Sequence, residues 1–149
     1  MTEIYIHDVG LRDGFQIEKK TVPTEQKIQW IDALMDSGVD IIQVGSFVHQ
    51  VKVPQMADTD ALFEHYAKNG KPNPKTVLSG LVLNEKGFER GLACGVEMFC
   101  MGVSASETHS QKNTGMSPAK AMEQILSMAK KARDAGKKVQ ASVQSAFGC

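Results

Sequence analysis

Short apolar runs alternate along this chain with longer segments in which apolar residues recur every three or four positions. The runs are typical of strands buried in a sheet, and the longer segments are typical of helices with one apolar face. The predicted strands are Ile4–Val9, Asp40–Gly45, Thr76–Leu81, Val96–Gly102 and Lys138–Val143. The predicted helices are Glu25–Ser37, a segment near Asp58–Lys68, a segment from Asn84 to about Cys94, and a segment from Ser117 to Ala135.

Capping residues mark several of the expected helix ends. Thr24 can cap the first helix, which Gly38 ends, and Asn84 can cap the third. Pro118 suits the first position of the last helix. The expected apolar face of that helix contains Met122, Ile125, Leu126, Ala129 and Ala132.

The alternation of strand and helix favours a parallel sheet whose strands are connected through helices. A doubly wound sheet and part of an eight-stranded (β/α)₈ barrel both fit this order. A dinucleotide-binding fold is disfavoured, because Gly10–Gly14 (GLRDG) stands where a G-x-G-x-x-G motif would be. The 149 residues are too few for a complete barrel, which needs roughly 250, so only four to five βα units would be present.

Charge and cysteine content exclude several classes of function. The 17 basic and 17 acidic residues are interspersed and give zero net charge, so we expect neither nucleic acid nor a membrane surface as a partner. No apolar run could span a bilayer, and the first residues lack the features of a signal peptide. The three cysteines have no Cys-x-x-Cys spacing, and Cys94 and Cys100 are expected to be small buried residues. We expect a reduced, cytoplasmic protein.

Polar side chains gather where the predicted strands end, and the carboxyl ends of barrel strands form the catalytic face. Arg12 and Asp13 follow the first strand directly. A carboxylate there suits Mg²⁺ or Mn²⁺, and an adjacent guanidinium can neutralise an oxyanion. The pair also fits a surface turn with an exposed ion pair, and the residues alone leave both interpretations open. Expected substrate-binding residues on this face are Gln16, Lys19, Ser46 and Ser145.

The histidines and one polar segment are weaker candidates. No two histidines are close in sequence, and His7 is expected to be a core or sheet-face residue of the first strand. His109 and Lys112 lie within Ser106–Met116, which we expect to be a long polar loop. Such a loop can bind a ligand or merely be solvated.

Four motifs, taken in order, resemble a single family. They are VGLRDGFQIEK at Val9–Lys19, GSFVHQVKVPQM at Gly45–Met56, SASETHSQKNTGM at Ser104–Met116, and the terminal SAFGC. Together they resemble the 3-hydroxy-3-methylglutaryl-CoA lyases, metal-dependent enzymes built on a (β/α)₈ TIM barrel. The resemblance covers the whole chain and about the first half of a family member. It implies an α/β fold in which residues 1–149 are the N-terminal portion of a single TIM-barrel domain.

The resemblance also implies a mechanism. A divalent metal, Mg²⁺ or Mn²⁺, acidifies the tertiary hydroxyl of an acyl-CoA, and loss of the proton cleaves a carbon–carbon bond to give acetyl-CoA and acetoacetate. Asp13 matches the family's metal-ligating aspartate, and Arg12 matches the catalytic arginine that stabilises the enolate oxygen. The acid that protonates the enolate, a His-x-His pair and an asparagine ligand belong to the family's second half. This chain alone is therefore expected to be inactive.

Gln43 departs from the family pattern, in which a glutamate follows the second strand. A neutral amide supplies no negative charge to Arg12 or to a metal, so the substrate could be another acyl-CoA. Two alternatives remain: a metal-dependent acetyl-CoA condensing enzyme or aldolase on the same barrel, and an inactive half-barrel that oligomerises. The VPQM motif favours the lyase over the related enzymes. We expect a homo-oligomer, because the edge strands of a partial barrel would be unpaired.

Overall fold

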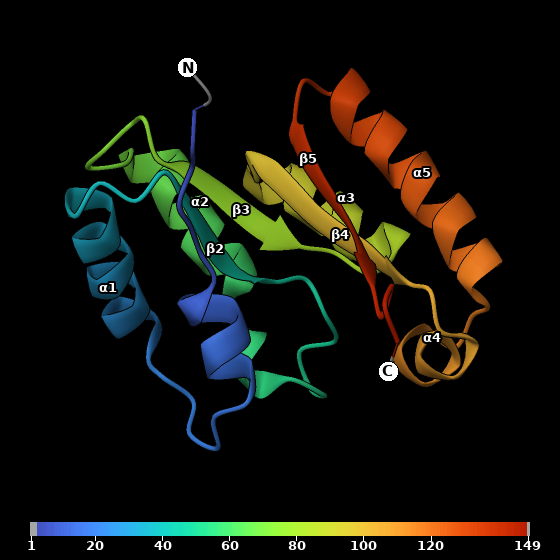
Figure 1. Cartoon of the computed structure of the whole chain (residues 1–149). Helices are drawn as coiled ribbons and strands as arrows, with labels where there is room; N and C mark the ends of the chain where they lie inside the picture. The colour runs from blue at the N-terminus through green and yellow to red at the C-terminus, as the bar shows by residue number, and fades with distance from the viewer. Residues whose placement is uncertain (1–2, 149) are drawn as a thin grey trace.

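A computed structural model describes residues 3–148 and contains one five-stranded parallel sheet. The strands are β1 (His7–Asp8), β2 (Ile41–Ser46), β3 (Val77–Leu81), β4 (Met98–Ser104) and β5 (Lys138–Gln144). Their order in space equals their order in the chain, without the reversal of a doubly wound sheet. The sheet curls so that β1 and β5 come forward on either side (Figure 1). The architecture is therefore about half of a TIM-barrel wall.

Helices cover the outer face of the curled sheet (Figure 1). They are α1 (Thr24–Asp36), α2 (Thr59–Asn69), α3 (Glu85–Cys94), α4 (Glu107–Thr114) and α5 (Pro118–Asp134), with a π-helical turn η1 (Gly10–Gly14) and a 3₁₀ turn η2 (Pro54–Met56). Asn84 caps α3 as predicted, since its side chain accepts a hydrogen bond from the Gly87 N–H at 2.9 Å. None of the helices within residues 3–148 is long and apolar enough to cross a membrane.

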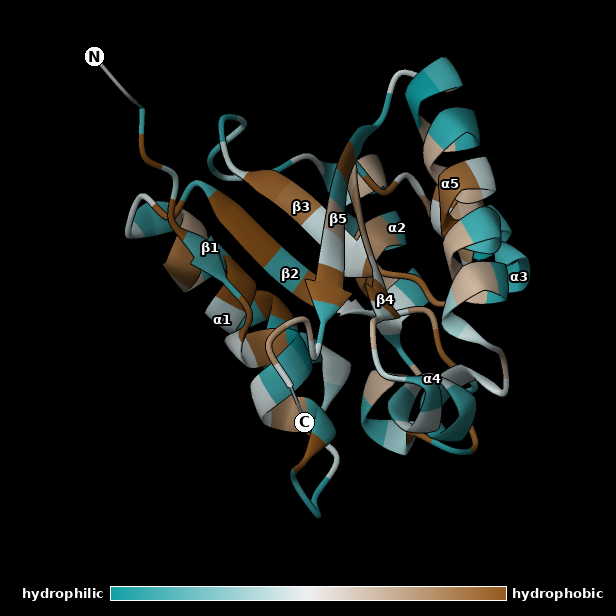
Figure 2. Cartoon of the chain, turned by 45° about the vertical axis from the view of Figure 1, so that its right-hand side comes forward, coloured by the Kyte–Doolittle hydropathy of each residue, from teal (hydrophilic) through white to brown (hydrophobic). Residues whose placement is uncertain are grey.

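The hydrophobic core lies between the sheet and the outer helices. Ile31 and Met35 of α1 and Ile42 of β2 are fully buried, and much of β2 and β3 is hydrophobic (Figure 2). Phe88 of α3 packs on Phe99 of β4, with ring centroids 4.8 Å apart. Each such side chain contributes about 1.5–3 kcal/mol by leaving water. The core thus holds the helices on one face and leaves the other face of the sheet free.

The first strand is shorter than predicted, so the prediction of Ile4–Val9 was wrong in length. Only His7–Asp8 pairs with β2. Upstream, the Ile6 N–H donates to the Asp40 carboxylate at 2.8 Å, and the side chain of Ile4 is 87% exposed. This segment has no second neighbour among the described residues, so little of its apolar surface is buried.

The prediction of a polar loop at Ser106–Met116 was also wrong, because most of this segment forms α4. The Ser106 hydroxyl caps the helix by accepting from the His109 N–H at 3.3 Å, and Gly115 ends it with a φ of 71°. The Ser110 hydroxyl donates to the Met116 carbonyl at 2.8 Å. The helix is therefore stabilised by its capping residues. It lacks the periodic apolar residues from which a helix is predicted.

Two details of the other helices differ from expectation. On α5, Met122 and Leu126 are 39% and 52% exposed. The buried residues of α5 are Ala121, Ile125, Met128 and Ala132. Thr24 does not cap α1 but is its first residue, and its hydroxyl donates to Asp58 at 3.0 Å. The buried face of α5 is thus rotated, and Met122 and Leu126 point away from the core.

Candidate functional site

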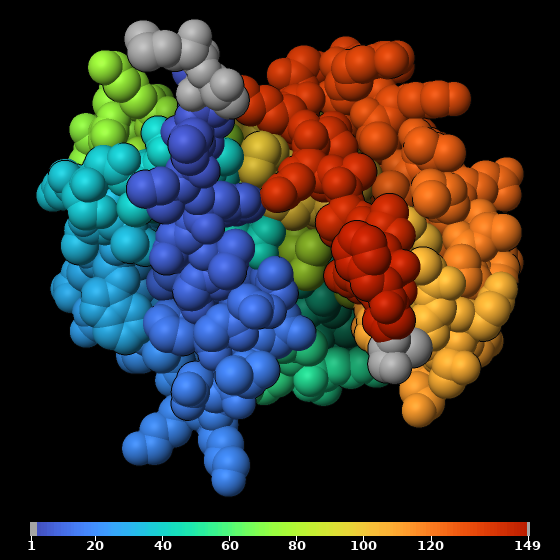
Figure 3. Space-filling model, in the orientation of Figure 1, coloured from blue at the N-terminus to red at the C-terminus, as the bar shows by residue number. Residues whose placement is uncertain are grey.

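The concave face of the sheet carries polar side chains where a closed barrel usually has branched apolar ones. Side chains alternate between the two faces of a strand, and the inward set lines a cavity of about 210 Å³. Its polar lining residues include His7, Arg12, Gln43, Cys100, Gln140 and Gln144. Figure 3 shows a hollow between the N-terminal and C-terminal segments. The inner wall is therefore suited to a polar ligand.

Arg12 is held in place from two sides. It lies in η1, where the Asp13 N–H donates to the Val9 carbonyl at 2.7 Å. Its Nε donates to Gln43 Oε1 at 2.5 Å, and its Nη1 donates to Asp13 Oδ1 at 2.6 Å. Gln43 is buried, and the β2 register shifts next to it, a kind of irregularity that re-aims a side chain. The guanidinium is thus oriented by groups of the chain itself.

Asp13 is the carboxylate that forms an ion pair with Arg12, and its side chain is 67% exposed. Within residues 3–148, no three His, Cys, Asp or Glu side chains converge on a common point. Mg²⁺ commonly binds through one or two carboxylates and completes its octahedron with water and substrate oxygens. Asp13 therefore fits as one ligand of a metal site, and other groups must complete it.

Two of the four expected substrate-binding residues carry unsatisfied polar atoms. Gln16 Oε1 and Ser46 Oγ are buried without a hydrogen-bond partner among the described residues. Buried polar atoms are normally bonded, so both oxygens have unused hydrogen-bonding capacity. Lys19 is exposed, and Ser145 lies just after β5 with a φ of 54°. None of the four lines the cavity that contains Arg12.

His7 belongs to the inner wall, a role that the sequence did not reveal. Its Nε2 lies 3.0 Å from Ser79 Oγ, which donates its proton to the Ile42 carbonyl at 3.2 Å. A hydroxyl that donates to a carbonyl can accept from an imidazole, so this arrangement fits the tautomer that carries its proton on Nε2. Burial lowers the pKa of His7, and the Arg12 charge adds to this, whereas Asp8 acts in the opposite direction. His7 is thus an imidazole oriented by Ser79, with a lowered pKa, in the same cavity as Arg12.

Cys100 is buried as expected, but it too faces the site. Its thiol donates to Gln140 Oε1 at 3.3 Å. Burial raises the pKa of the Cys100 thiol, although hydrogen bonding to Gln43 and Ser79 and the Arg12 charge lower it. One signal could have revealed this wall: Gln140, Ser142 and Gln144 recur at every second position of β5. Such a polar row on an inward-facing strand surface indicates a binding site.

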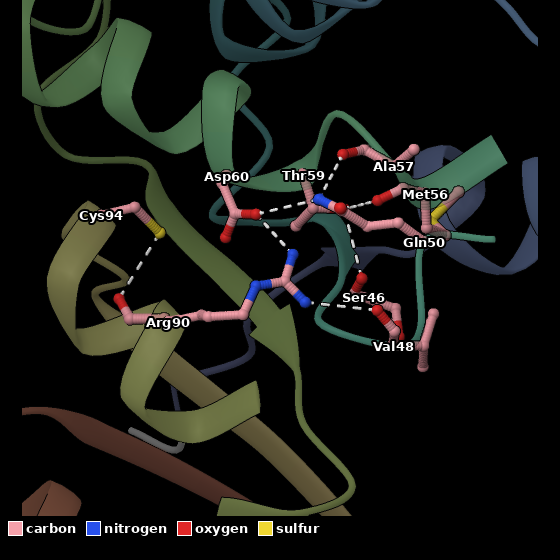
Figure 4. A network of polar contacts seen from close by, with 10 residues as sticks. Ser46, Val48, Gln50, Met56, Ala57, Thr59, Asp60, Arg90 and Cys94 are labelled. Atoms are coloured by element: carbon pink, nitrogen blue, oxygen red, sulfur yellow. Dashed lines mark hydrogen bonds and ion pairs between the residues drawn. The ribbon is translucent and has the colours of Figure 1, made fainter. Parts of the chain in front are cut away.

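The loop after β2 is fixed by a polar network shown in Figure 4. Arg90 of α3 donates to the Val48 carbonyl at 3.2 Å, forms an ion pair with Asp60, and lies 5.6 Å from the centroid of the Phe47 ring. Gln50 donates to the Ala57 carbonyl at 3.0 Å. A second cavity of about 320 Å³ lies between this loop and the start of α3. The network holds the loop that follows Ser46.

His109 and Lys112, the weaker candidates, are exposed on α4. Neither residue lines the cavity that contains Arg12 or the second cavity beside α3. The structure therefore brings together Arg12, Asp13 and Gln43 but leaves these two outside the site.

Known proteins are similar to this chain over nearly its whole length. The family model described as HMGL-like matches residues 3–149. The cytoplasmic 3-hydroxy-3-methylglutaryl-CoA lyase of Danio rerio is 38% identical over 146 residues, which make up 98% of this chain and 42% of that protein. The 3-hydroxy-3-isohexenylglutaryl-CoA/hydroxymethylglutaryl-CoA lyase of Pseudomonas aeruginosa is 33% identical over 147 residues, 99% of this chain and 48% of that protein. The chain thus spans less than half the length of these relatives.

Solved structures share the fold. The HMG-CoA lyase of Bacillus subtilis matches with a TM-score of 0.89 at 32% identity and covers 99% of this chain and 48% of that one. The HMG-CoA lyase of Acinetobacter baumannii, in complex with coenzyme A and 3-methylmalate, matches with a TM-score of 0.87 at 28% identity. That match covers 100% of this chain and 48% of the other.

Proposed function

The chain belongs to the HMGL-like family, and from this we propose that its concave face is the N-terminal half of the active site of a carbon–carbon lyase acting on an acyl-CoA. In this proposal residues 1–149 are the N-terminal portion of one barrel domain. One observation carries it: Arg12, held by Gln43 and Asp13 at the carboxyl ends of the strands, faces the cavity of the inner wall.

Arg12 is proposed as the catalytic residue that stabilises the enolate. When the carbon–carbon bond breaks, negative charge moves onto the thioester oxygen of the departing acetyl-CoA. The bonds to Gln43 and Asp13 engage Nε and Nη1, which leaves Nη2 for that oxygen. An oriented donor of this kind stabilises a developing oxyanion by about 3–4 kcal/mol.

Asp13 is proposed as one ligand of Mg²⁺ or Mn²⁺, because its carboxylate is exposed at the same edge of the sheet. A bound divalent metal would acidify the substrate hydroxyl. Gln16 and Ser46 are proposed to bind the substrate through their unpartnered oxygens. Lys19 and Ser145 are proposed to bind it from the loops after η1 and β5.

The substrate is proposed to be a 3-hydroxyacyl-CoA, cleaved to acetyl-CoA and a keto acid such as acetoacetate. Coenzyme A bound to the Acinetobacter baumannii relative supports the CoA portion. The Pseudomonas aeruginosa relative is named for two acyl groups, which supports variation of the acyl portion. Gln43, in place of the expected glutamate, is the difference through which the chain would accept another acyl group, whose keto acid would then replace acetoacetate. We propose the cytoplasm as its location, as for the Danio rerio relative, although the Bos taurus relative is mitochondrial.

The proposal is tested by completing the barrel. The chain is joined to the second half of the Bacillus subtilis lyase, and acetyl-CoA release is measured with Mg²⁺ or Mn²⁺. We expect no turnover by the chain alone and turnover by the joined protein. Arg12→Lys should lower kcat by about 10²–10³, since lysine lacks the planar fork, and Asp13→Ala should weaken metal binding as well as turnover.

The chain contains a matched control pair. Arg133 and Asp134 are also adjacent and bonded, but they are exposed at the end of α5. Arg133→Lys and Asp134→Ala should leave turnover unchanged. A folded joined protein that cleaves no acyl-CoA would overturn the function, and full turnover by Arg12→Lys would overturn the role of Arg12.

A further inference from the structure

The VPQM motif contains the turn η2, and the proposed reaction gives this turn no role. Two side chains from the neighbouring helices hold its backbone. Lys27 of α1 donates to the Gln55 carbonyl at 2.7 Å. Thr59 of α2 donates to the Met56 carbonyl at 2.8 Å (Figure 4), and the side chain of Met56 is 2% exposed. The turn is therefore a fixed part of the fold.

A buried ion pair lies behind the turn. The side chain of Lys27 is 2% exposed, and its Nζ also donates to Asp58 Oδ1 at 2.6 Å. The other carboxylate oxygen of Asp58 accepts a hydrogen bond from the Thr24 hydroxyl at 3.0 Å. Moving either charged group away would leave a buried charge without its partner, which is strongly unfavourable. The pair therefore ties the start of α1 to the turn and to the start of α2.

The side chain of Gln55 extends from this fixed turn to the loop between η1 and α1. Its Nε2 donates to the Glu18 carbonyl at 2.5 Å, across 37 positions of the chain. The Glu18 N–H donates to the Phe15 carbonyl at 3.2 Å, within the loop. In the part of the chain that the structure describes, the Gln55 contact is the one hydrogen bond from residues 18–22 to a distant segment. Gln55 thus connects the loop to the rigid turn.

The same loop carries two of the proposed substrate-binding residues. Gln16 and Lys19 stand on either side of Glu18, and Gln16 Oε1 is the buried oxygen without a partner among the described residues. A third proposed residue, Ser46, is connected to the same turn, because the Thr59 hydroxyl lies 3.3 Å from the Ser46 carbonyl oxygen. Binding residues on loops depend on a rigid scaffold for their position. The turn and the start of α2 are that scaffold for all three.

We propose that Gln55 is a positioning residue for the acyl-CoA substrate, because it holds Gln16 and Lys19 in the arrangement that binds. This inference rests on the proposed lyase function. Gln55 acts through the backbone of the loop, whereas Arg12 and Asp13 are bonded to each other and do not depend on it. Without the contact, the substrate must order a free loop when it binds, and its binding is weaker.

Replacing Gln55 in the joined barrel tests the proposal. Gln55→Met and Gln55→Glu both remove the N–H donor and keep a side chain of similar length. KM for the acyl-CoA should rise about threefold to tenfold, as for the loss of one hydrogen bond, while kcat and its Mg²⁺ dependence change by less than about twofold. Trypsin should cut the chain after Lys19 or Lys20 about threefold to tenfold faster, since proteolysis follows the population of the open loop. The proteolysis measurement needs no turnover.

The matched control is Gln111→Met on α4. Gln111 also donates its side-chain amide to a backbone carbonyl, that of Gly115 at 3.3 Å, but it lies outside the site. This variant should change neither KM nor the rate of proteolysis after Lys19 and Lys20. Circular dichroism would confirm that every variant is folded.

The possible failures are distinguishable. An unchanged rate of proteolysis in both Gln55 variants would overturn the hold on the loop. Faster proteolysis with an unchanged KM would overturn the role in substrate binding and leave the lyase function standing. A folded joined barrel without turnover would overturn the lyase function and the substrate role with it, even if Gln55→Met still speeds proteolysis. An equal rise in KM with Gln111→Met would also overturn the proposal.

Discussion

The two ends of the curled sheet carry similar residues in different surroundings. At the β1–β2 end, Gln43 is 3% exposed and bonded to Arg12, and nearby the buried Lys27 of α1 is paired with Asp58. At the β4–β5 end, the glutamines of β5 are largely exposed, and the ion pair of Lys131 with Glu85 is open to solvent. A polar side chain is therefore held in one position where helices and strands pack around it, and it stays exposed where they do not. Its residue type does not decide between the two.

The largest expected loss of unfolding free energy comes from breaking the buried ion pair of Lys27 with Asp58. Lys27 donates to Asp58 Oδ1 at 2.6 Å and to the Gln55 carbonyl at 2.7 Å. Lys27→Met leaves the carboxylate of Asp58 largely buried without its partner and should cost about 3–5 kcal/mol. Lys131→Met, at the exposed pair, should cost about 0–1 kcal/mol. Urea unfolding measures the unfolding free energy of both variants. Equal losses would refute the claim that surrounding elements hold one pair more firmly than the other.

A smaller loss of stability is expected from adding a side-chain atom where α3 contacts the loop after β2. A Cβ at Gly87 would lie 2.6 Å from the Phe47 carbonyl oxygen, so the backbone must shift. Gly87→Ala should cost up to about 2 kcal/mol, because overpacking exceeds the gain in helix propensity. Gly14→Ala is the control, since nothing lies within 4 Å of its Cβ position. Thermal unfolding would show whether only Gly87→Ala lowers Tm.

In the joined barrel, Gln43→Glu should change kcat/KM by about tenfold, or ~1.4 kcal/mol, and shift the preferred acyl-CoA. A carboxylate there would neutralise the Arg12 charge that the amide leaves intact. Gln29→Glu is the control, because Gln29 is exposed on α1 and is bonded to Gln26 rather than to an arginine. Steady-state kinetics on two acyl-CoA substrates provide the measurement. Unchanged values with Gln43→Glu would mean that residue 43 does not act through Arg12.

The smallest effect concerns the pH dependence of folding. The pKa of His7 is lowered below its ordinary 6.5 by burial, so the folded chain binds fewer protons near that pH than the unfolded chain. This contribution to stability is fully present above pH 6.5 and is lost as the pH falls through the folded-state pKa. His7→Gln should flatten the dependence of Tm on pH. His109→Gln, on the exposed α4, controls for loss of an imidazole.

The sequence predicted the order of strands and most helix ends, because periodicity and caps are local properties. Asn84 caps α3, and Gly38, with a φ of 85°, follows the end of α1, as expected. The length of β1 could not be predicted, since it depends on a neighbouring strand and on the Asp40 side chain that bonds Ile6. The helix α4 was missed because it has caps but no apolar stripe.

The site was predictable only in part. Arg12 and Asp13 were found from their position after a strand, and the structure brings them together with Gln43. His7 was not found as a site residue, because its bond to Ser79 spans 72 positions of the chain. Which face of each strand is concave depends on how the sheet curls, and a local pattern does not contain that information.

Two buried thiols lie in different layers of the fold, and the rate at which a reagent labels each thiol reports how often the structure around it opens. Cys94, whose pKa burial raises to about 12, lies at the end of α3 in the outer layer, whereas Cys100 faces the hollow. A thiol reagent reaches either one only when the surrounding structure opens. With Cys149 replaced by serine, any molecule that fills the hollow would slow the labelling of Cys100 and leave that of Cys94 unchanged. The ratio of the two rates therefore reports occupancy of the inner wall separately from loosening of the helical layer.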